Sequence, residues 1–203
     1  MNRATLSVIT VLAAGLSLSS VNAFAECTTP GACQTNEKDP FATSPFQLPA
    51  GVGDDWKGYR TDWSRITGFE LSGLHWQQFV IVYLNKGRDI YKQNYGEYVR
   101  FYVEEDDEED TDFQLYPTGT VFIKENYLAQ DGRVGQPLTL TTMVKREPGY
   151  DPEHNDWEYI QSSVSGKVLL QGPYSDPTVK AVCAECHNNI AERDYIFSTF
   201  YSE

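Results

Sequence analysis

Residues 77–84 read Gln-Gln-Phe-Val-Ile-Val-Tyr-Leu, a run of β-branched and aromatic side chains that favours a strand. The turn sequence Asn85-Lys86-Gly87 ends this run. Three later segments, 119–124, 138–146 and 156–162, are also rich in strand-forming residues, and each has a turn signal nearby. Short strands separated by turn residues predict an antiparallel sheet.

A few helices are expected beside this sheet. One precedes Gln77, a second covers Ile90 to Tyr95, and a third near the C-terminus carries residues 183–191. The segment 97–103 alternates moderately between polar and apolar residues, so we expect it to form one more strand. The sequence therefore predicts an α+β fold with a mainly antiparallel sheet.

The chain is acidic, with a formal net charge of −13 over 203 residues. This balance argues against nucleic acid and anionic membrane surfaces as partners. Much of the charge lies in residues 104–112, Glu-Glu-Asp-Asp-Glu-Glu-Asp-Thr-Asp, which we interpret as a solvated loop between two strands. A docking patch for a basic redox partner and a weak calcium site are the alternatives for this run.

The first 25 residues have the features of an export signal. Met1-Asn2-Arg3 is short and basic, and Leu6 to Leu18 is apolar but short for a membrane span. Ala23-Phe24-Ala25 then supplies the small residues that a signal peptidase reads. We expect residues 1–25 to be removed, and the rest of the chain to be periplasmic without a membrane span.

Residues 26–54 have little periodicity and are expected to form an extended arm. Cys27 and Cys33 lie in this arm, and Pro30-Gly31 between them is a turn signal that could bring their thiols together. In an oxidising compartment a small disulfide loop is expected, with a functional dithiol as the alternative. Residues 55–203 are expected to form a single domain.

The motif Cys183-Ala184-Glu185-Cys186-His187 predicts covalent attachment of one c-type haem. The two thiols can each add to a haem vinyl group, and the imidazole of His187 can then bind the iron. A zinc site would need further ligands from Cys27, Cys33, His75 or His154. A thioredoxin-like dithiol would follow a βαβ unit, and no such unit is expected before Cys183.

The chain resembles the cytochrome P-460 family, which includes the cytochromes c′-beta, over about residues 55–203. The order and spacing of several blocks carry this resemblance, and together they are more specific than the CxxCH motif alone. The blocks are 116–125 (Tyr-Pro-Thr-Gly-Thr-Val-Phe-Ile-Lys-Glu), 142–146, 149–152, 156–159, 183–187 and 193–197 (Arg-Asp-Tyr-Ile-Phe).

The resemblance implies a homodimer with one haem per chain and no protein ligand on the distal side of the iron. Members of the P-460 type oxidise hydroxylamine in the periplasm, and a lysine bonds covalently to their haem. Lys124 of this chain matches the position of that lysine. The c′-beta relatives lack the bond and bind nitric oxide or other diatomic ligands.

Lys124 is also notable from its own context. In a strand, Phe122 and Lys124 share one face and Val121 and Ile123 share the other, so the amine is expected at the edge of an aromatic cavity. Burial there favours the neutral, nucleophilic amine. The alternative is a lysine at the strand end whose ammonium lies in water, paired with Glu125.

Several other residues are candidates for the haem pocket. His75 and His154 are expected to be surface or structural histidines, and Met143 is expected to pack in the core. A pocket that removes protons from hydroxylamine needs a base, and Glu125, Asp151, Asp156 and Glu158 are the available acids.

Three functions follow from these observations. The first is a redox enzyme that oxidises hydroxylamine or nitric oxide, with Lys124 in its active site and a soluble redox partner. The second is a protein that binds nitric oxide or another diatomic ligand. The third is an electron carrier, which requires a sixth iron ligand from Met143, His75 or Lys124.

Overall fold

The computed structural model describes residues 44–75, 77–104, 110–199 and 201. The predicted signal peptide at 1–25 and the predicted disulfide between Cys27 and Cys33 lie outside the described residues. Most of the predicted arm at 26–54 lies outside them as well. Within the described part of the chain, no helix is long and apolar enough to cross a membrane.

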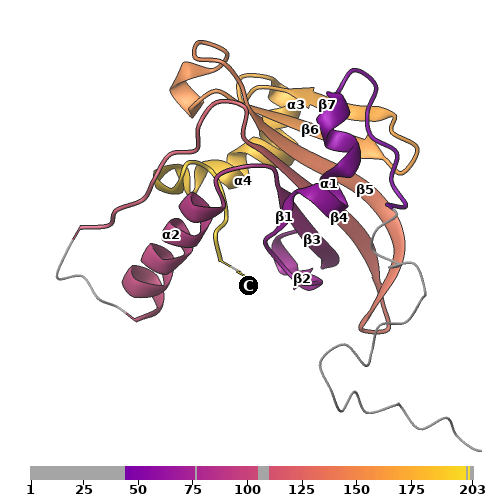
Figure 1. The fold of residues 1–203 in the computed structure, drawn as a ribbon, viewed down its shortest axis with the longest axis horizontal. Helices are drawn as coiled ribbons and strands as arrows, with labels where there is room; N and C mark the ends of the chain where they lie inside the picture. Colours follow the sequence, from indigo (N-terminus) through magenta and orange to yellow (C-terminus); the bar gives the residue numbers. More distant parts are fainter. Residues whose placement is uncertain (1–43, 76, 105–109, 200, 202–203) are drawn as a thin grey trace, which may run out of the picture. The chain divides into compact units, whose positions relative to one another are not determined.

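The described residues form an antiparallel sheet of seven strands, which confirms the predicted fold class (Figure 1). Strands β3 to β7 pair in chain order, and β1 and β2 both pair with β3 on its outer edge. The strands are β1 (Ser64–Arg65), β2 (Glu70–Ser72), β3 (Gln78–Leu84), β4 (Val121–Gln130), β5 (Arg133–Lys145), β6 (Trp157–Ser163) and β7 (Val168–Gly172).

The four strands predicted at 77–84, 119–124, 138–146 and 156–162 correspond to β3, β4, β5 and β6. Strands β4 and β5 are longer than predicted because they form a hairpin around Asp131-Gly132. Both turn residues have positive φ, 51° and 71°, as a two-residue hairpin loop requires. The three remaining strands, β1, β2 and β7, were not expected from the sequence.

Short helices surround the sheet. They are α1 (Tyr59–Asp62), α2 (Arg88–Tyr98), α3 (Pro177–Val179) and α4 (Glu185–Asn188). Turns of 3₁₀-helix occur at Asp54–Gly58, Gly73–His75, Pro152–His154 and Ala191–Arg193, and single π-turns occur at Val99–Val103 and Lys180–Ala184. The helix expected at 90–95 lies within α2, and the one expected at 183–191 lies largely in the run from α3 to α4.

The strand predicted at 97–103 is wrong, because this segment continues α2 into a π-turn. Tertiary contacts override its alternating pattern. The Arg193 guanidinium lies over the rings of Tyr98 and Tyr102, at 5.0 and 5.4 Å from their centroids. Those two rings stack on each other one helical turn apart. The acidic run at 104–112 therefore follows a helix and not a strand, and its residues 105–109 lie outside the described part.

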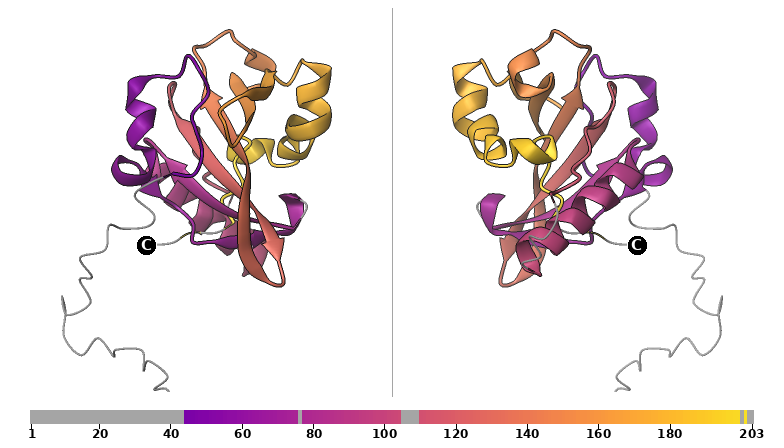
Figure 2. Two further views of the ribbon diagram at one scale, coloured as in Figure 1. Left: turned by 90° about the vertical axis from the view of Figure 1, so that its right-hand side faces the viewer. Right: turned by 90° about the vertical axis from the view of Figure 1, so that its left-hand side faces the viewer.

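The sheet separates two hydrophobic cores, because alternate residues of a strand face opposite sides. Figure 2 shows α1 on one face and α4 on the other, with β4 and β5 between them. The core on the α4 face includes Phe122, Met143, Trp157 and Tyr159, and the core on the α1 face includes Ile81, Ile123, Val144 and Ile160.

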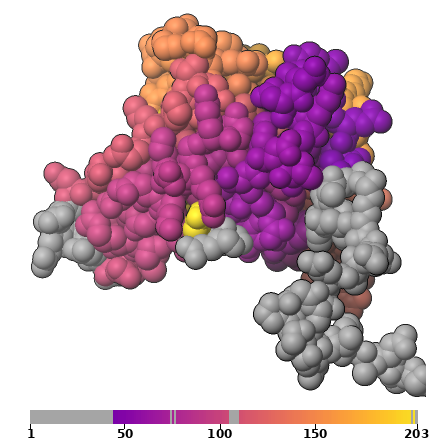
Figure 3. Space-filling model, viewed as in Figure 1, coloured from indigo at the N-terminus to yellow at the C-terminus, as the bar shows by residue number. Residues whose placement is uncertain are grey.

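The C-terminal segment lies against α2. The ring of Tyr201 packs on Tyr91 and stacks on Tyr95, at centroid distances of 6.2 and 6.1 Å. A small area of this segment is visible beside α2 on the surface (yellow in Figure 3). Helix α2 and the C-terminal segment therefore close the α4 face of the sheet at one side.

Candidate haem site

The helical run that carries the CxxCH motif begins at a well-formed cap. The Asp176 carboxylate accepts hydrogen bonds from the backbone N–H groups of Thr178 and Val179, at 2.8 and 3.0 Å. Pro177 follows at the first helical position, where its missing N–H is no loss. Val179 is fully buried and anchors the run in the core. These contacts fix the direction in which Cys183 to His187 are presented.

The three motif residues meet at one pocket on the α4 face of the sheet. Cys183, Cys186 and His187 all line this pocket, and neither cysteine takes part in a disulfide bond. Cys183 is partly buried, whereas Cys186 is exposed at the surface. No group of three or more metal-ligating His, Cys, Asp or Glu side chains occurs among the described residues. The arrangement matches the attachment of a haem better than it matches a zinc site.

His187 is oriented by the backbone. Its Nδ1 donates a hydrogen bond to the carbonyl oxygen of Tyr195 at 2.6 Å, so the proton is on Nδ1 and the lone pair is on Nε2. Its ring packs edge-on against Tyr159 and Phe197. Burial, followed by the nearby Lys124 amine, lowers the pKa of His187 to about 4. The side chain is therefore a neutral imidazole with a free nitrogen, which is the form that binds iron.

Lys124 lines the same pocket. It lies on β4 opposite Val82 of β3 and Thr141 of β5, and it shares a face with the pocket residue Phe122, as predicted. Burial lowers the pKa of Lys124 to about 7, and the thiols of Cys183 and Cys186 partly offset this effect. A substantial fraction of its amine is therefore neutral, and hence nucleophilic, at neutral pH.

His75 also lines the pocket, whereas the sequence had suggested a surface or structural residue. Its Nε2 is in hydrogen-bond contact with Nζ of Lys124, and its Nδ1 lies 2.9 Å from Oγ of Ser72. The tautomer protonated on Nδ1 satisfies both contacts. Burial, with smaller effects of Lys124 and His187, lowers the pKa of His75 to about 3. No residue pattern around His75 indicates this role, because the histidine enters the pocket through a short 3₁₀ turn.

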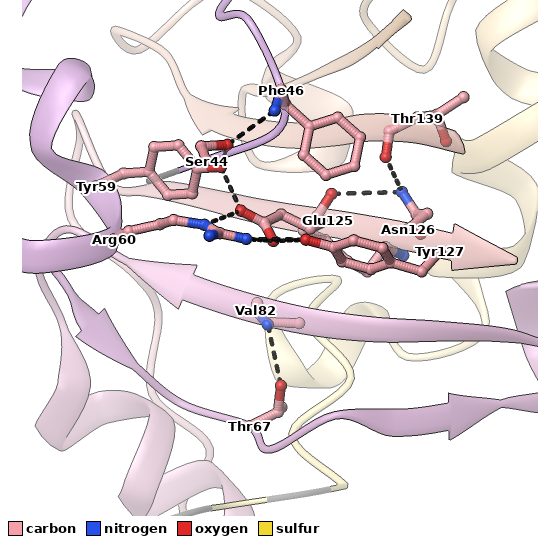
Figure 4. A network of polar contacts seen from close by, with 11 residues as sticks. Ser44, Phe46, Tyr59, Arg60, Thr67, Val82, Glu125, Asn126, Tyr127 and Thr139 are labelled. Carbon is pink, nitrogen blue, oxygen red and sulfur yellow. Dashed lines mark hydrogen bonds and ion pairs between the residues drawn. The ribbon is translucent and has the colours of Figure 1, made fainter. Parts of the chain in front are cut away.

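Glu125 faces away from the pocket, so the alternative pairing of Lys124 with Glu125 is wrong. Its carboxylate is fully buried on the α1 face and is bound by Arg60, with Nε and Nη2 at 2.6 and 2.5 Å from its two oxygens (Figure 4). The hydroxyls of Tyr59 and Tyr127 also donate to it. This satisfied network joins α1 to β4.

The other three candidate acids have partners elsewhere, and none of them lines the pocket. Asp151 accepts from the Tyr174 backbone and contacts His154, which stacks on the Tyr174 ring. Glu158 binds Arg146. Asp156 accepts from two backbone N–H groups in its own turn. His154 is thus structural, as predicted.

The remaining pocket wall suits a porphyrin. It is largely apolar and includes Ile66, Val80, Val82, Phe122, Ile196 and Phe197. Met143, predicted to be a core residue, is buried in the cluster that forms this wall. Tyr159 is buried too, and its hydroxyl has no hydrogen-bond partner among the described residues, so a bound group could supply one. Two thiols, a neutral imidazole and an apolar wall fit a haem.

Comparison with known proteins agrees with this chemistry. A family model described as Cytochrome P460 matches residues 76–198, a span that includes Lys124 and the whole CxxCH motif. A search of curated proteins gives no match. The matched span begins just after His75, so that histidine belongs to the part of the pocket that the family model does not cover.

Proposed function

We propose that this chain, which belongs to the cytochrome P460 family, is a mono-haem c-type cytochrome that oxidises hydroxylamine or a related nitrogen species such as nitric oxide. The observation that carries this proposal is the contact of Lys124 with His75 in the pocket that Cys183, Cys186 and His187 line. A nucleophilic amine and a proton acceptor therefore lie beside the residues that would hold the haem.

In this proposal, Cys183 and Cys186 attach the haem through thioether bonds and Nε2 of His187 binds the iron. The amine of Lys124 would bond to a carbon of the macrocycle, and a two-electron oxidant such as a peroxide would take up the two hydrogens that the partners lose. A haem bound in this way would supply an open iron position for the substrate nitrogen and would accept its electrons. The family resemblance of residues 116–125 supports the role given to Lys124.

Protons must leave hydroxylamine as it is oxidised, and the described pocket offers one neutral base that this proposal assigns neither to the iron nor to the macrocycle. His75 stays unprotonated at neutral pH, because burial lowers its pKa to about 3. Ser72 lies at its other ring nitrogen and holds the ring in place. We assign His75 the role of proton acceptor from its place in the pocket, instead of the four acids considered from the sequence. The bond of Lys124 to the macrocycle would remove a lysine charge that lowers the pKa of His75, and so bring this pKa closer to the working pH that a base requires.

Substitution of Lys124 tests this function. Lys124→Leu is expected to lower the rate of hydroxylamine oxidation by at least about 100-fold, the low end of what a positioned catalytic group contributes. The matched control is Lys86→Leu, because Lys86 is a lysine outside the pocket that donates to the Thr118 carbonyl at the surface. Steady-state turnover with an artificial electron acceptor measures both variants. Equal turnover in Lys124→Leu and wild-type protein would contradict the proposal.

A second function is favoured by the apolar wall and by the lack of Asp and Glu side chains among the pocket residues. Such a pocket would bind nitric oxide or another diatomic ligand without chemistry. The same assay separates the two functions, because a binding protein would turn over no hydroxylamine in any variant. For either function we propose export through residues 1–25 to the periplasm, a homodimer and a soluble redox partner, on the basis of the sequence.

A further inference from the structure

Asp194 lies in the tight segment between the CxxCH helix and the C-terminus, and its carboxylate is fully buried. Nζ of Lys145 donates to both of its oxygens at 2.7 and 2.8 Å. The backbone N–H of Tyr116 donates to Oδ2 at 2.8 Å. Asn155 Nδ2 and Trp157 Nε1 donate to Oδ1 at 2.9 and 3.1 Å. These hydrogen bonds connect the segment to β5, to β6 and to the loop before β4. We call Asp194 and its four partners, Lys145, Tyr116, Asn155 and Trp157, the Asp194 clamp.

The backbone at this point is held in an uncommon conformation. Asp194 and Tyr195 have φ values of 53° and 65°, and two successive non-glycine residues with positive φ are unfavourable by themselves. The hydrogen bonds to the Asp194 carboxylate offset this cost. The turn that results is closed by the N–H of Tyr195, which donates to the Ile190 carbonyl at 3.2 Å.

This turn determines the hydrogen bond made by His187, the proposed iron ligand. The carbonyl of Tyr195, directly after the fixed aspartate, accepts the hydrogen bond from Nδ1 of His187 at 2.6 Å. A histidine that donates such a bond is a stronger electron donor through its other nitrogen. The position of the Tyr195 carbonyl therefore controls how strongly His187 can donate to a metal.

We propose that Asp194 is a positioning residue that sets the donor strength of His187, and through it the reduction potential of the haem. Asp194 does not touch His187 itself, and it acts only by fixing the Tyr195 carbonyl. Stronger donation stabilises ferric over ferrous iron, so the intact clamp lowers the midpoint potential. This inference rests on the proposal that His187 binds the iron, but not on any particular substrate.

The test compares two variants of the haem-loaded protein that each disrupt a buried ion pair. Asp194→Asn removes the charge from the clamp, and Arg60→Met disrupts the Glu125 network on the opposite face of the sheet. Both are expected to lower stability, because each leaves a buried partner without its counter-charge. The readouts are the midpoint potential and the iron–histidine stretching frequency of the ferrous protein by resonance Raman spectroscopy.

We expect Asp194→Asn to raise the potential and lower the stretching frequency, and Arg60→Met to change neither. An unchanged frequency and potential in Asp194→Asn would overturn the inference and leave the proposed function intact. If Asp194→Asn does not fold, Asn155→Ala decides by the same readouts, because it removes one donor and keeps the ion pair with Lys145. A wild-type ferrous protein that is five-coordinate and high-spin by its optical spectrum but shows no iron–histidine band would refute His187 ligation, and the inference with it.

Discussion

Lys124 and Glu125 are neighbours in the chain, yet their side chains lie in different chemical environments on opposite faces of β4. Lys124 enters the haem pocket, and Glu125 is bound by Arg60 and two tyrosines on the other side. The period of two in a strand predicts this separation from the sequence alone. The place of His75 in the pocket could not be predicted in this way. The pairing of β2 with β3 brings the turn that carries His75 close to Lys124, and no local residue pattern indicates that pairing.

The low pKa of His75 leads to a prediction for a single residue, namely how His75 affects the dependence of protein stability on pH. Burial lowers this pKa to about 3 from 6.5, so the unfolded chain binds a proton more readily between these values. Stability is therefore fully retained above pH 6.5 and falls as the pH is lowered toward 3. We expect His75→Gln to remove this part of the pH dependence, as measured by urea unfolding of the haem-loaded protein across this range.

The control for this prediction is His154→Gln, since His154 lies outside the pocket in the turn between β5 and β6. Measured in the same way, it separates the effect of losing the pocket histidine from the effect of replacing a histidine elsewhere in the fold. A His75→Gln profile that matched the wild-type profile would show that His75 is not held in its neutral form.

At the scale of elements, the sequence predicted the strands and helices that have a residue pattern of their own. It did not predict the elements that depend on contacts between residues far apart in the chain. The central strands were recognisable from β-branched and aromatic residues between turns. The segment 97–103 has the same composition but forms the end of α2, because Arg193 packs on its tyrosines from a distant part of the chain. The short strands β1, β2 and β7 are defined by their partners and have little pattern of their own.

The cap of the haem-motif helix gives a prediction at this scale. Asp176→Ala removes the acceptor for two N–H groups, and we expect it to lower the free energy of unfolding by about 1 kcal/mol. Urea unfolding followed by circular dichroism measures the change. Asp176→Asn is the matched variant, because an asparagine also caps well and should restore most of the loss. Equal losses in the two variants would mean that the cap is not the cause.

At the scale of the whole molecule, the side chains on the two faces of one sheet have different roles. Its α1 face holds a satisfied polar network within a hydrophobic core (Figure 4). Its α4 face, opposite α1 in Figure 2, is the one whose residues line the candidate haem pocket. The sequence predicted Cys183, Cys186 and His187 as members of one site, because CxxCH is a contiguous motif, and all three residues line the pocket. The rest of the pocket, including Ser72 and His75, is assembled from segments that are distant in the chain, as is the hydrogen-bond network of Asp194 outside the pocket, so local patterns could not predict them.

The central claim is that this pocket holds a haem bonded to Cys183, Cys186 and Lys124. The most direct measurement is the denatured intact mass of the purified protein, together with its ferric and dithionite-reduced optical spectra. We predict a covalent haem adduct whose mass is two hydrogens lower than that of the simple adduct, with a strongly red-shifted ferrous Soret band. A simple haem adduct mass with an ordinary high-spin c-type spectrum would contradict the bond to Lys124, and loss of haem on denaturation would contradict the attachment itself.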